Sequence, residues 1–339
     1  MAKATIHDVA ALAGVSIKTV SRVVNNEPRV RESTIEKVQQ AIQQLGYRPS
    51  TSARSLAGNR SYLLALLYDN PNAHYVIDVQ YGALEACQTN HYELIIRPCR
   101  YQDKSTLQDI ESLVSNAKVD GFILTPPLSD TPAITKALTK LEAPFVCISS
   151  QPQETLSPSV GCDDFKASYE MTETLIQHGH QRIGFIIGHP DHSTSAARLA
   201  GFEKALADHK ITQKKNLLIQ GYNDAESGQK AAEKLLALKQ PPSAIFASND
   251  DMAAGALQVA QQHKIQVPEQ LSIAGFDDSP ISQLTWPPIT TIQQPTRAMG
   301  SKAVELLLDQ LREPQQQHPH TTLPYTLLAR ESLTKISDT

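Results

Sequence analysis

The sequence has little of what membrane-spanning or secreted proteins need. No apolar run approaches the length that crosses a bilayer. The N-terminal segment MAKATIHDVAALAG has no apolar core and no cleavage site, so we expect no signal peptide. The four cysteines are scattered and form no CxxC pair, which favours free thiols in a reducing compartment. We therefore expect a cytoplasmic protein with no membrane partner.

Sequence motifs of common enzyme classes are also missing. There is no GxGxxG after the first predicted strand, no phosphate loop, no GxSxG elbow and no HExxH. His178 and His180 resemble a metal-binding doublet, but no third ligand is in sight, so we expect them to be structural. We predict no catalytic residue, no metal and no cofactor.

The charge is distributed unevenly along the chain. Residues 1–60 contain nine Lys and Arg against four Asp and Glu, a net charge of +5. The remaining residues contain 22 basic against 31 acidic side chains, a net charge of −9. A basic end on an acidic body is typical of a protein that contacts nucleic acid at that end. A merely solvated surface would give the same asymmetry, so the charge alone does not decide.

Helix signals divide the N-terminal segment into three helices, over residues 6–13, 17–24 and 32–45. Thr5 and Asp8 are typical of a capping box, and Gly14 suits a left-handed helix end. Ser16 can cap the second helix, which leaves a three-residue turn as in a helix-turn-helix. Apolar residues at helical spacing predict a small core: Val9, Ala10, Ala13, Val20, Val23, Val24, Ile35, Val38, Ala41, Ile42 and Leu45.

The polar face of the second helix is the predicted DNA-reading surface. In a helix-turn-helix, the start of this helix enters the major groove. Lys18 and Arg22 could donate to guanine there, and Ile17 could contact a thymine methyl. Residues with short polar side chains suit phosphate contacts: Thr5, Ser16, Thr19, Ser21 and Asn25. The alternative is a solvated face on a helical hairpin.

The stretch DVAALAGVS-xx-TVSRVVN resembles the headpiece of the LacI/GalR family, and the resemblance runs from Thr5 to Pro49. It implies a bacterial transcription regulator that binds pseudo-palindromic, double-stranded operator DNA as a homodimer. We expect a dimer rather than a tetramer because no heptad-like segment follows Arg330. Arg31 stands where the family usually has a capping Ser, Asn or Asp, so we expect a weak N-cap on the third helix.

Residues 50–60 resemble the hinge of the same family. The resemblance implies that this segment becomes ordered on DNA, where Leu56 is inserted between base steps of the minor groove with the small Ala53 beside it. Apolar wedges of this kind kink the duplex. Taken without the resemblance, the segment is too short and too polar for a stable helix, and a flexible linker is the alternative.

From Ser61 onward, β-rich apolar runs alternate with helical patterns, and the alternation restarts near residue 160. This predicts two similar α/β lobes with parallel sheets. The resemblance implies a periplasmic-binding-protein fold whose chain crosses between lobes near Asp163, Gln293 and Pro324. We thus expect a small all-α helix-turn-helix headpiece plus an α/β two-lobed periplasmic-binding-protein-like domain. The predicted domains are residues 1–49 (headpiece), 50–60 (hinge), 61–163 with 293–323 (N-terminal lobe) and 164–292 with 324–339 (C-terminal lobe).

Polar residues follow most of the predicted strands, at the sheet edges where open α/β folds bind ligands. Carboxylates, amides and aromatic rings there suit a polyhydroxylated small molecule such as a sugar. The family resemblance implies effector contacts at six positions: Arg198, Asn249 and Asp277, and less closely Tyr75, Asp164 and Gln294. Asn223 stands where many relatives have a stacking aromatic residue, and the adjacent Tyr222 is out of register.

Several of these residues have structural alternatives. We expect Asp250 to cap the helix that follows it rather than to contact the ligand. Arg198 could form an ion pair within the protein. Trp286 could be either a sugar platform or a loop anchor between prolines, and the roles of His189 and His192 stay open.

Taken together, these features predict a repressor that a sugar or glycoside releases from its operator. A repressor that requires a co-repressor would have the same sequence features. A sugar-processing enzyme with paired aspartates is a rival, but Arg198 would hold such a carboxylate ionised. A sugar-binding transport protein would share the two-lobed fold but would need export.

Overall fold

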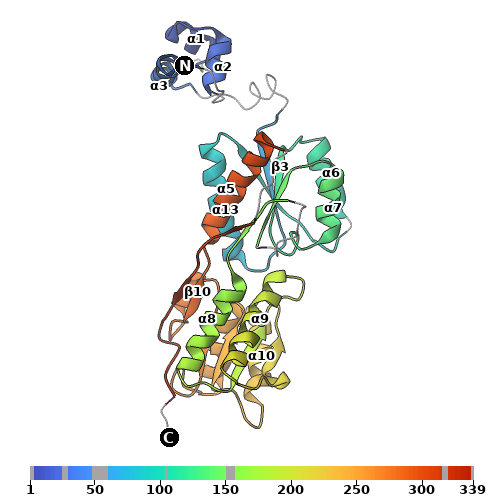
Figure 1. Cartoon of the computed structure of the whole chain (residues 1–339), viewed down its shortest axis with the longest axis vertical. Helices are drawn as coiled ribbons and strands as arrows, with labels where there is room; N and C mark the ends of the chain where they lie inside the picture. The colour runs from blue at the N-terminus through green and yellow to red at the C-terminus, as the bar shows by residue number, and fades with distance from the viewer. Residues whose placement is uncertain are drawn as a thin grey trace. The chain divides into compact units, whose positions relative to one another are not determined.

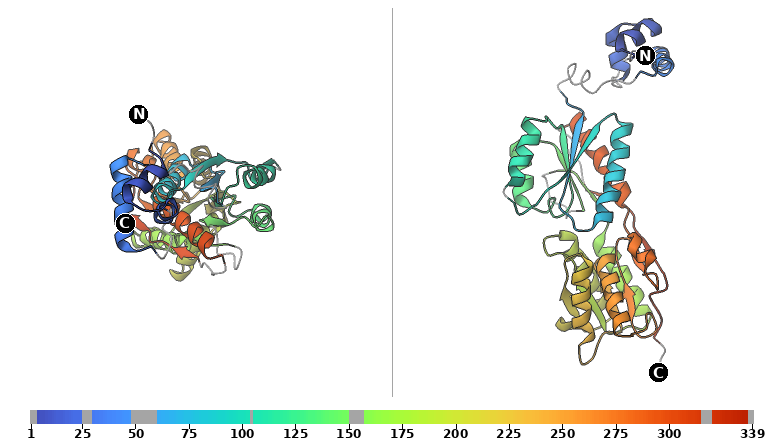
Figure 2. Two further views of the ribbon diagram at one scale, coloured as in Figure 1. Left: turned by 90° about the horizontal axis from the view of Figure 1, so that it is seen from above. Right: turned by 180° about the vertical axis from the view of Figure 1, so that it is seen from behind.

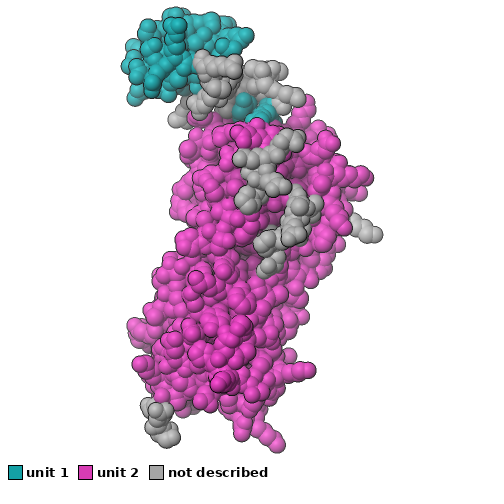
Figure 3. All heavy atoms as spheres, in the orientation of Figure 1, with its two compact units in different colours: residues 1–62 teal, residues 63–339 magenta. Residues whose placement is uncertain are grey.

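The computed structural model describes residues 4–24, 30–47, 60–103, 105–149, 157–314 and 320–336. The chain forms two units, residues 1–62 and residues 63–339, which Figure 3 shows in different colours. Asn25, Ala53 and Leu56 lie outside the described residues, as does most of the predicted hinge. Their roles in DNA binding therefore stay predictions.

The first unit consists of three helices with the predicted bounds, α1 (Ile6–Ala13), α2 (Ile17–Val24) and α3 (Glu32–Leu45). The capping box of Thr5 and Asp8 is confirmed, and Gly14 ends α1 with a left-handed φ of 66°. Arg31 makes no side-chain cap on α3, also as predicted. The predicted apolar residues pack together around the fully buried Val9, Val20 and Val38.

The second unit begins with a six-stranded sheet that forms the first lobe. All its strand pairs are parallel, in the order β11-β5-β4-β3-β1-β2. In Figures 1 and 2, α5 and α13 cover one face of this sheet and α6 and α7 cover the other. The elements are β1 (Leu63–Tyr68), α5 (Ala73–Thr89), β2 (Glu93–Pro98), α6 (Ser105–Ser115), β3 (Gly121–Leu124), α7 (Pro132–Lys140), β4 (Phe145–Ile148), β5 (Ser159–Gly161), α13 (Thr296–Arg312) and β11 (Thr321–Thr322).

The second lobe contains a four-stranded parallel sheet in the order β7-β6-β8-β9. Helices α8 and α9 pack together on one side of it, and α10 and α11 pack together on the other. The elements are α8 (Asp164–Gln177), β6 (Ile183–Ile187), α9 (Ser193–Asp208), the 3₁₀ helix η1 (Lys215–Leu217), β7 (Leu218–Gln220), α10 (Ala225–Leu236), β8 (Ala244–Ala247), α11 (Asp250–Gln262), β9 (Ser272–Ala274) and α12 (Pro280–Leu284).

Three connections join the two lobes. The chain leaves the first sheet after β5, returns through β10 (Thr291–Gln293) to α13, and leaves it again after β11 for β12 (Thr326–Leu328). Strands β10 and β12 pair antiparallel beside the second lobe. The predicted crossing positions fall in these connections, and the predicted two-lobed α/β architecture is confirmed.

Helix α13 packs closely on α5 although more than two hundred residues separate them in sequence. A Cβ atom on Gly82 would lie 1.8 Å from the backbone oxygen of Arg297, and one on Gly300 would lie 2.2 Å from that of Val79. Only glycine permits this approach, because any other side chain would overlap the facing backbone. The pair therefore fixes α13 onto the first lobe.

Among the described residues, no helix is both long and apolar enough to cross a membrane. Within the same residues, no three His, Cys, Asp or Glu side chains are grouped as metal ligands would be. The four cysteines are buried free thiols.

Candidate functional site

The outer face of α2 presents the residues that were predicted to read DNA. Val20 and Val23 are buried in the headpiece core, whereas Lys18 and Arg22, one turn apart, are exposed. Ile17 begins α2 and is 41% exposed, although isoleucine is among the residues most often buried. The half-buried Thr19 and Ser21 belong to the same helix. This apolar and basic surface has the composition that base-edge contacts require.

Hydroxyl groups at the starts of α1 and α2 already have partners within the headpiece. The Thr5 hydroxyl lies 2.8 Å from Asp8 Oδ2. The Ser16 hydroxyl accepts the Thr19 backbone N–H at 3.1 Å and lies 2.9 Å from the Thr19 hydroxyl. These contacts cap the helices, which Ser16 was predicted to do. The phosphate contacts predicted for these residues stay a prediction.

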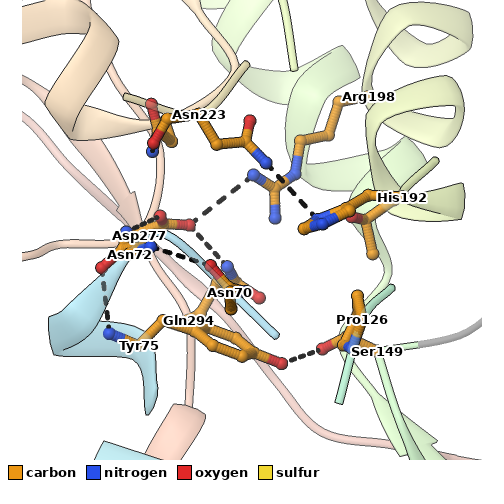
Figure 4. Close-up of a pocket in the computed structure, with 12 residues that line it drawn as sticks. Asn70, Asn72, Tyr75, Pro126, Ser149, His192, Arg198, Asn223, Asp277 and Gln294 are labelled. Atoms are coloured by element: carbon orange, nitrogen blue, oxygen red, sulfur yellow. Dashed lines mark hydrogen bonds and ion pairs between the residues drawn. The ribbon is translucent and has the colours of Figure 1, made fainter. Parts of the chain in front are cut away.

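A polar pocket lies between the two lobes of the second unit, beyond the ends of strands from both sheets (Figure 4). Its free volume is about 30 Å³, room for roughly two water molecules. The first lobe contributes Asn70, Asn72, Tyr75, Pro126 and Ser149. The second lobe contributes His192, Thr194, Arg198, Asn223, Asn249 and Asp277, and the connecting segment contributes Gln294. Of the six predicted effector residues, all but Asp164 line this pocket.

The centre of the site is a buried cluster of one cation and two anions. Arg198, on α9, donates from Nε to Asp164 Oδ1 at 2.7 Å and from Nη1 to the Ser248 carbonyl at 2.5 Å. Its Nη1 also lies 3.6 Å from Asp277 Oδ1. The guanidinium stacks on Phe276, 3.7 Å from the ring centroid. Asp164 therefore belongs to the site as the partner of Arg198, not as part of the pocket wall.

Burial controls the ionisation of this cluster. It raises the pKa of Asp277 to about 7, although Arg198 and the hydrogen bond from Gln294 both oppose the rise. Burial also raises the pKa of Asp164, again against the effect of Arg198. Burial disfavours the charge of Arg198, but the two carboxylates outweigh it and raise the pKa of the guanidinium. Arg198 thus stays charged, while Asp277 is poised between its two protonation states near neutral pH. The prediction that Arg198 would hold such a carboxylate ionised is therefore wrong for Asp277, because the effect of burial is larger than that of the nearby cation.

Asp277 also joins the two lobes. Gln294 Nε2 donates to its Oδ1 at 2.6 Å, and Asn72 Nδ2, from the first lobe, donates to its Oδ2 at 3.1 Å. The same Asn72 caps α5, because its Oδ1 accepts the Tyr75 backbone N–H at 3.1 Å. The Tyr75 hydroxyl donates to Ser149 Oγ at 2.9 Å. Figure 4 shows Asn72 and Gln294 meeting at Asp277, with Tyr75 reaching across the pocket to Ser149.

The residue that caps α11 is the neighbour of the one predicted to do so. Asp250 was predicted to cap α11, but Asn249 is the N-cap, with its Oδ1 accepting the Met252 N–H at 3.0 Å. Asp250 is wholly buried, and its carboxylate accepts from Ser279 N–H at 2.7 Å and from Thr291 Oγ1 at 2.6 Å. The prediction for Asp250 was wrong because both residue types make good caps and sequence alone does not place the first helical turn.

Direct hydrogen bonds join the lobes beside the pocket. Asp130, which follows β3, accepts the Ser193 backbone N–H at 3.0 Å and the Ser193 hydroxyl at 2.8 Å. A carboxylate of the first lobe thereby satisfies the start of α9, whose own N-cap residue makes no side-chain cap bond to the helix. The Tyr101 hydroxyl also donates to the carboxylate of Asp191. These contacts were not foreseen, because nothing local in the sequence marks partners so far apart.

Two buried histidines, His180 and His192, have different surroundings. His180 is buried between the Ser243 and Ser272 hydroxyls at 3.0 Å each, and burial lowers its pKa to about 4. This agrees with the structural role predicted for it. His192 lines the pocket, 3.4 Å from Asn223 Nδ2, and burial lowers its pKa to about 3. It is therefore a neutral imidazole at neutral pH.

Trp286 does not line the interlobe pocket. Its side chain is 77% exposed, and its carbonyl accepts from Gln261 Nε2 at 2.9 Å. The sugar-platform alternative for Trp286 is thus wrong for this pocket. Asn72, Ser149 and Thr194 were missed as pocket residues, whereas Asn70 is one of the polar residues expected after a strand and the role of His192 had been left open.

Comparison with known proteins finds a matching family for each of the two units. The profile of bacterial regulatory proteins of the lacI family matches residues 5–50, and that of the periplasmic binding protein-like domain matches residues 172–333. The HTH-type transcriptional repressor PurR of Photobacterium profundum is 34% identical over 91% of this chain and 92% of its own. The ribose operon repressor of Haemophilus influenzae is 32% identical over 97% of this chain and 98% of its own length.

Solved structures agree with this assignment. The lac repressor dimer bound to operator and the anti-inducer ONPF superposes with a TM-score of 0.75 and 28% identity, covering 98% of this chain and all of that one. The predicted combination of helix-turn-helix headpiece and periplasmic-binding-protein-like domain is confirmed. With similarity of this degree over nearly its whole length, the chain belongs to the lacI family of bacterial regulatory proteins.

Proposed function

We propose that this DNA-binding repressor is a homodimer whose headpieces bind a pseudo-palindromic operator and that a sugar bound between its lobes releases it. The observation that carries the proposal is the position of Asp277. Its carboxylate contacts Arg198 of the second lobe and Asn72 of the first. A ligand that bonds to Asp277 must therefore change how the two lobes are joined.

Lobe closure gives the ligand its influence on DNA binding. A ligand can shift a two-state equilibrium only by binding one state more tightly than the other. The pocket is built from both lobes, so its affinity depends on their relative position. We infer that the sugar favours a lobe arrangement in which the paired headpieces no longer fit two operator half-sites. Because the operator lies on the bacterial chromosome, we infer that the protein acts in the cytoplasm.

We further infer that the protein binds its effector without turning it over. Glycoside hydrolysis needs two carboxyl groups on opposite sides of the scissile bond. Here Asp164 and Asp277 both face the same guanidinium, and Asp164 is buried behind Arg198 rather than on the pocket wall. Incubation with a bound sugar, followed by chromatography, should return that sugar unchanged.

The experiment that tests the proposal measures operator binding with and without sugars. Footprinting on the DNA beside the gene identifies the operator, and fluorescence anisotropy of that duplex then gives the affinity of the full-length protein. We expect at least one sugar to weaken operator binding by tenfold or more. If a sugar strengthens operator binding instead, the effector is a co-repressor and not an inducer. If no sugar changes the affinity, the sensing half of the proposal is wrong.

A further inference from the structure

The residues that line the pocket indicate a narrower class of effector than sugars in general. From the geometry of the pocket we infer that the effector is a neutral, polyhydroxylated molecule the size of one sugar ring. This inference rests on the proposed function and names the ligand of the same site. It excludes sugar phosphates, planar heterocycles and disaccharides. Three observations carry it: the charges, the aromatic rings and the room between the lobes.

The charges of the pocket are already neutralised within the protein. Arg198 is the only Lys or Arg side chain among the described lining residues, and it faces Asp164 at 2.7 Å and Asp277 at 3.6 Å. His192 adds no positive charge, because burial lowers its pKa to about 3. A phosphate or carboxylate would thus lie beside carboxylates with no unpaired cation to receive it. An ammonium group would have to compete with Arg198 for the same two anions.

The remaining polar groups are neutral donors and acceptors spread over both lobes. Asn70 Nδ2 and the hydroxyl of Thr194 have no protein partner in the part of the chain that the structure describes. Asn223 Nδ2 faces His192 at 3.4 Å, a long contact that a ligand hydroxyl can replace. The Tyr75 hydroxyl donates to Ser149 and keeps its oxygen free to accept. Such groups match the hydroxyls of a polyol, each of which both donates and accepts.

Few aromatic surfaces are available for a flat ligand. Among the described lining residues only Tyr75 and His192 have aromatic rings, and the nearby Phe276 is covered by the Arg198 guanidinium at 3.7 Å. A planar heterocycle has two apolar faces and is normally held between rings or apolar side chains. A sugar ring has a small apolar face that one aromatic ring can cover. The aromatic content therefore favours the polyol.

The pocket around Arg198 and Asp277 is small and is bordered by contacts between the lobes. Its free volume is about 30 Å³. Ser193, between the lining residues His192 and Thr194, is bonded to Asp130 of the opposite lobe. The Tyr101 hydroxyl bonds to Asp191 in the same loop. A ligand larger than this volume has to displace contacts such as that of Asn72 with Asp277, and each further ring would also have to break the contacts of Asp130 and Tyr101.

Isothermal titration calorimetry of the full-length protein without DNA tests the inference. The probes are D-ribose, D-xylose, D-glucose and D-fructose, the phosphate esters of ribose and glucose, cellobiose, and hypoxanthine. We expect at least one of the four neutral monosaccharides to bind, and to bind at least tenfold more tightly than its phosphate ester, cellobiose or hypoxanthine. The inference is overturned if a phosphate ester, cellobiose or hypoxanthine binds as tightly as the best monosaccharide or more tightly. It is also overturned if none of the four monosaccharides binds.

Two variants place the binding in this pocket. Asn223→Asp adds a charge beside His192, and Thr194→Val removes a neutral hydroxyl without changing the shape of the side chain. Each should weaken the monosaccharide by about tenfold. Asn116→Asp, the same change at an exposed residue just after α6, is the matched control and should bind normally. Unchanged binding in both pocket variants would place the sugar elsewhere.

The two proposals fail in different ways. If cellobiose or a sugar phosphate binds and also releases the operator in the anisotropy assay, the repressor proposal stands, but the inference that the effector is a neutral monosaccharide is refuted. If a monosaccharide binds in calorimetry but leaves operator affinity unchanged, the ligand class stands and the release mechanism is refuted.

Discussion

Replacing Asp277 by asparagine should make the ligand-free protein more stable and less responsive at the same time. The amide has the shape of the protonated acid and cannot ionise. In the folded protein the Asp277 carboxyl is buried, and its pKa is about 7 against an ordinary value of 3.8. The folded state therefore resists a charge that the unfolded chain accepts readily.

The size and sign of the effect follow from this difference. Between pH 3.8 and about 7 the folded protein holds a proton at Asp277 that the unfolded chain has released. Stability therefore falls as the pH rises through this window, and the loss is complete above it. Three pH units correspond to roughly 4 kcal/mol. Asp277→Asn should recover most of this lost free energy of unfolding at about pH 8, but less than about 2 kcal/mol of it at pH 5.

Thermal unfolding at the two pH values measures the effect. At roughly 2 °C per kcal/mol for a unit of this size, the variant should melt about 8 °C higher at pH 8. Asp278→Asn is the matched control, because the neighbouring carboxylate accepts from Arg330 and Gln293, and its loss should lower stability. A lower melting temperature for Asp277→Asn at pH 8 would show that the charge pair with Arg198 stabilises the fold. Sugar binding by the same variant should fall by tenfold or more, because a hydrogen bond to a charged group is lost.

Three other predictions concern the headpiece, the hinge and the lobe contact. Lys18→Ala and Arg22→Ala should each cost roughly 1–3 kcal/mol on the preferred operator and relax base preference, whereas equal losses on random DNA in anisotropy would indicate phosphate contacts. Leu56→Ala should weaken operator binding and leave sugar binding intact, and an unchanged operator affinity and DNA bend would mean that the segment is only a linker. Asp130→Asn removes the carboxylate that accepts both Ser193 donors and should weaken sugar binding by up to about tenfold in calorimetry. Normal affinity would show that this contact does not stabilise the ligand-binding arrangement.

The fold of the headpiece could be predicted to the residue because its helix ends depend on local chemistry. Thr5, Ser16, Gly14 and Gly46 act on backbone groups within a few positions of themselves. In the α/β unit the alternation of strands and helices could be predicted, but not the first residue of each helix. Helix α5, for example, begins at Ala73, because Asn72 caps it. A cap after a strand is less visible in sequence, since loops contain many residues of the same types.

The site was only partly predictable for a different reason. The family resemblance indicated Arg198 and Asp277, and the structure brings them together with Asp164. Asn72 lies 205 positions from Asp277 in the chain, yet its amide donates to that carboxylate. Periodicity and capping report on neighbours in sequence, whereas this contact depends on how two lobes meet. His192 was left open because its neutral state follows from burial, which the sequence does not show.

The path of the chain between lobes also determines the order in which a ribosome can complete them. Strands β1–β5 are synthesised first, but α13, which packs on α5, β3, β4 and β5, and the edge strand β11 come only after the whole second sheet. Until then the nascent first lobe exposes the apolar surface that Met299, Ala303, Val304 and Leu307 later cover. The sheet of the second lobe is continuous in sequence and can form earlier. The lobe that begins first is thus finished last, and during translation it is the part of the protein most in need of protection from aggregation.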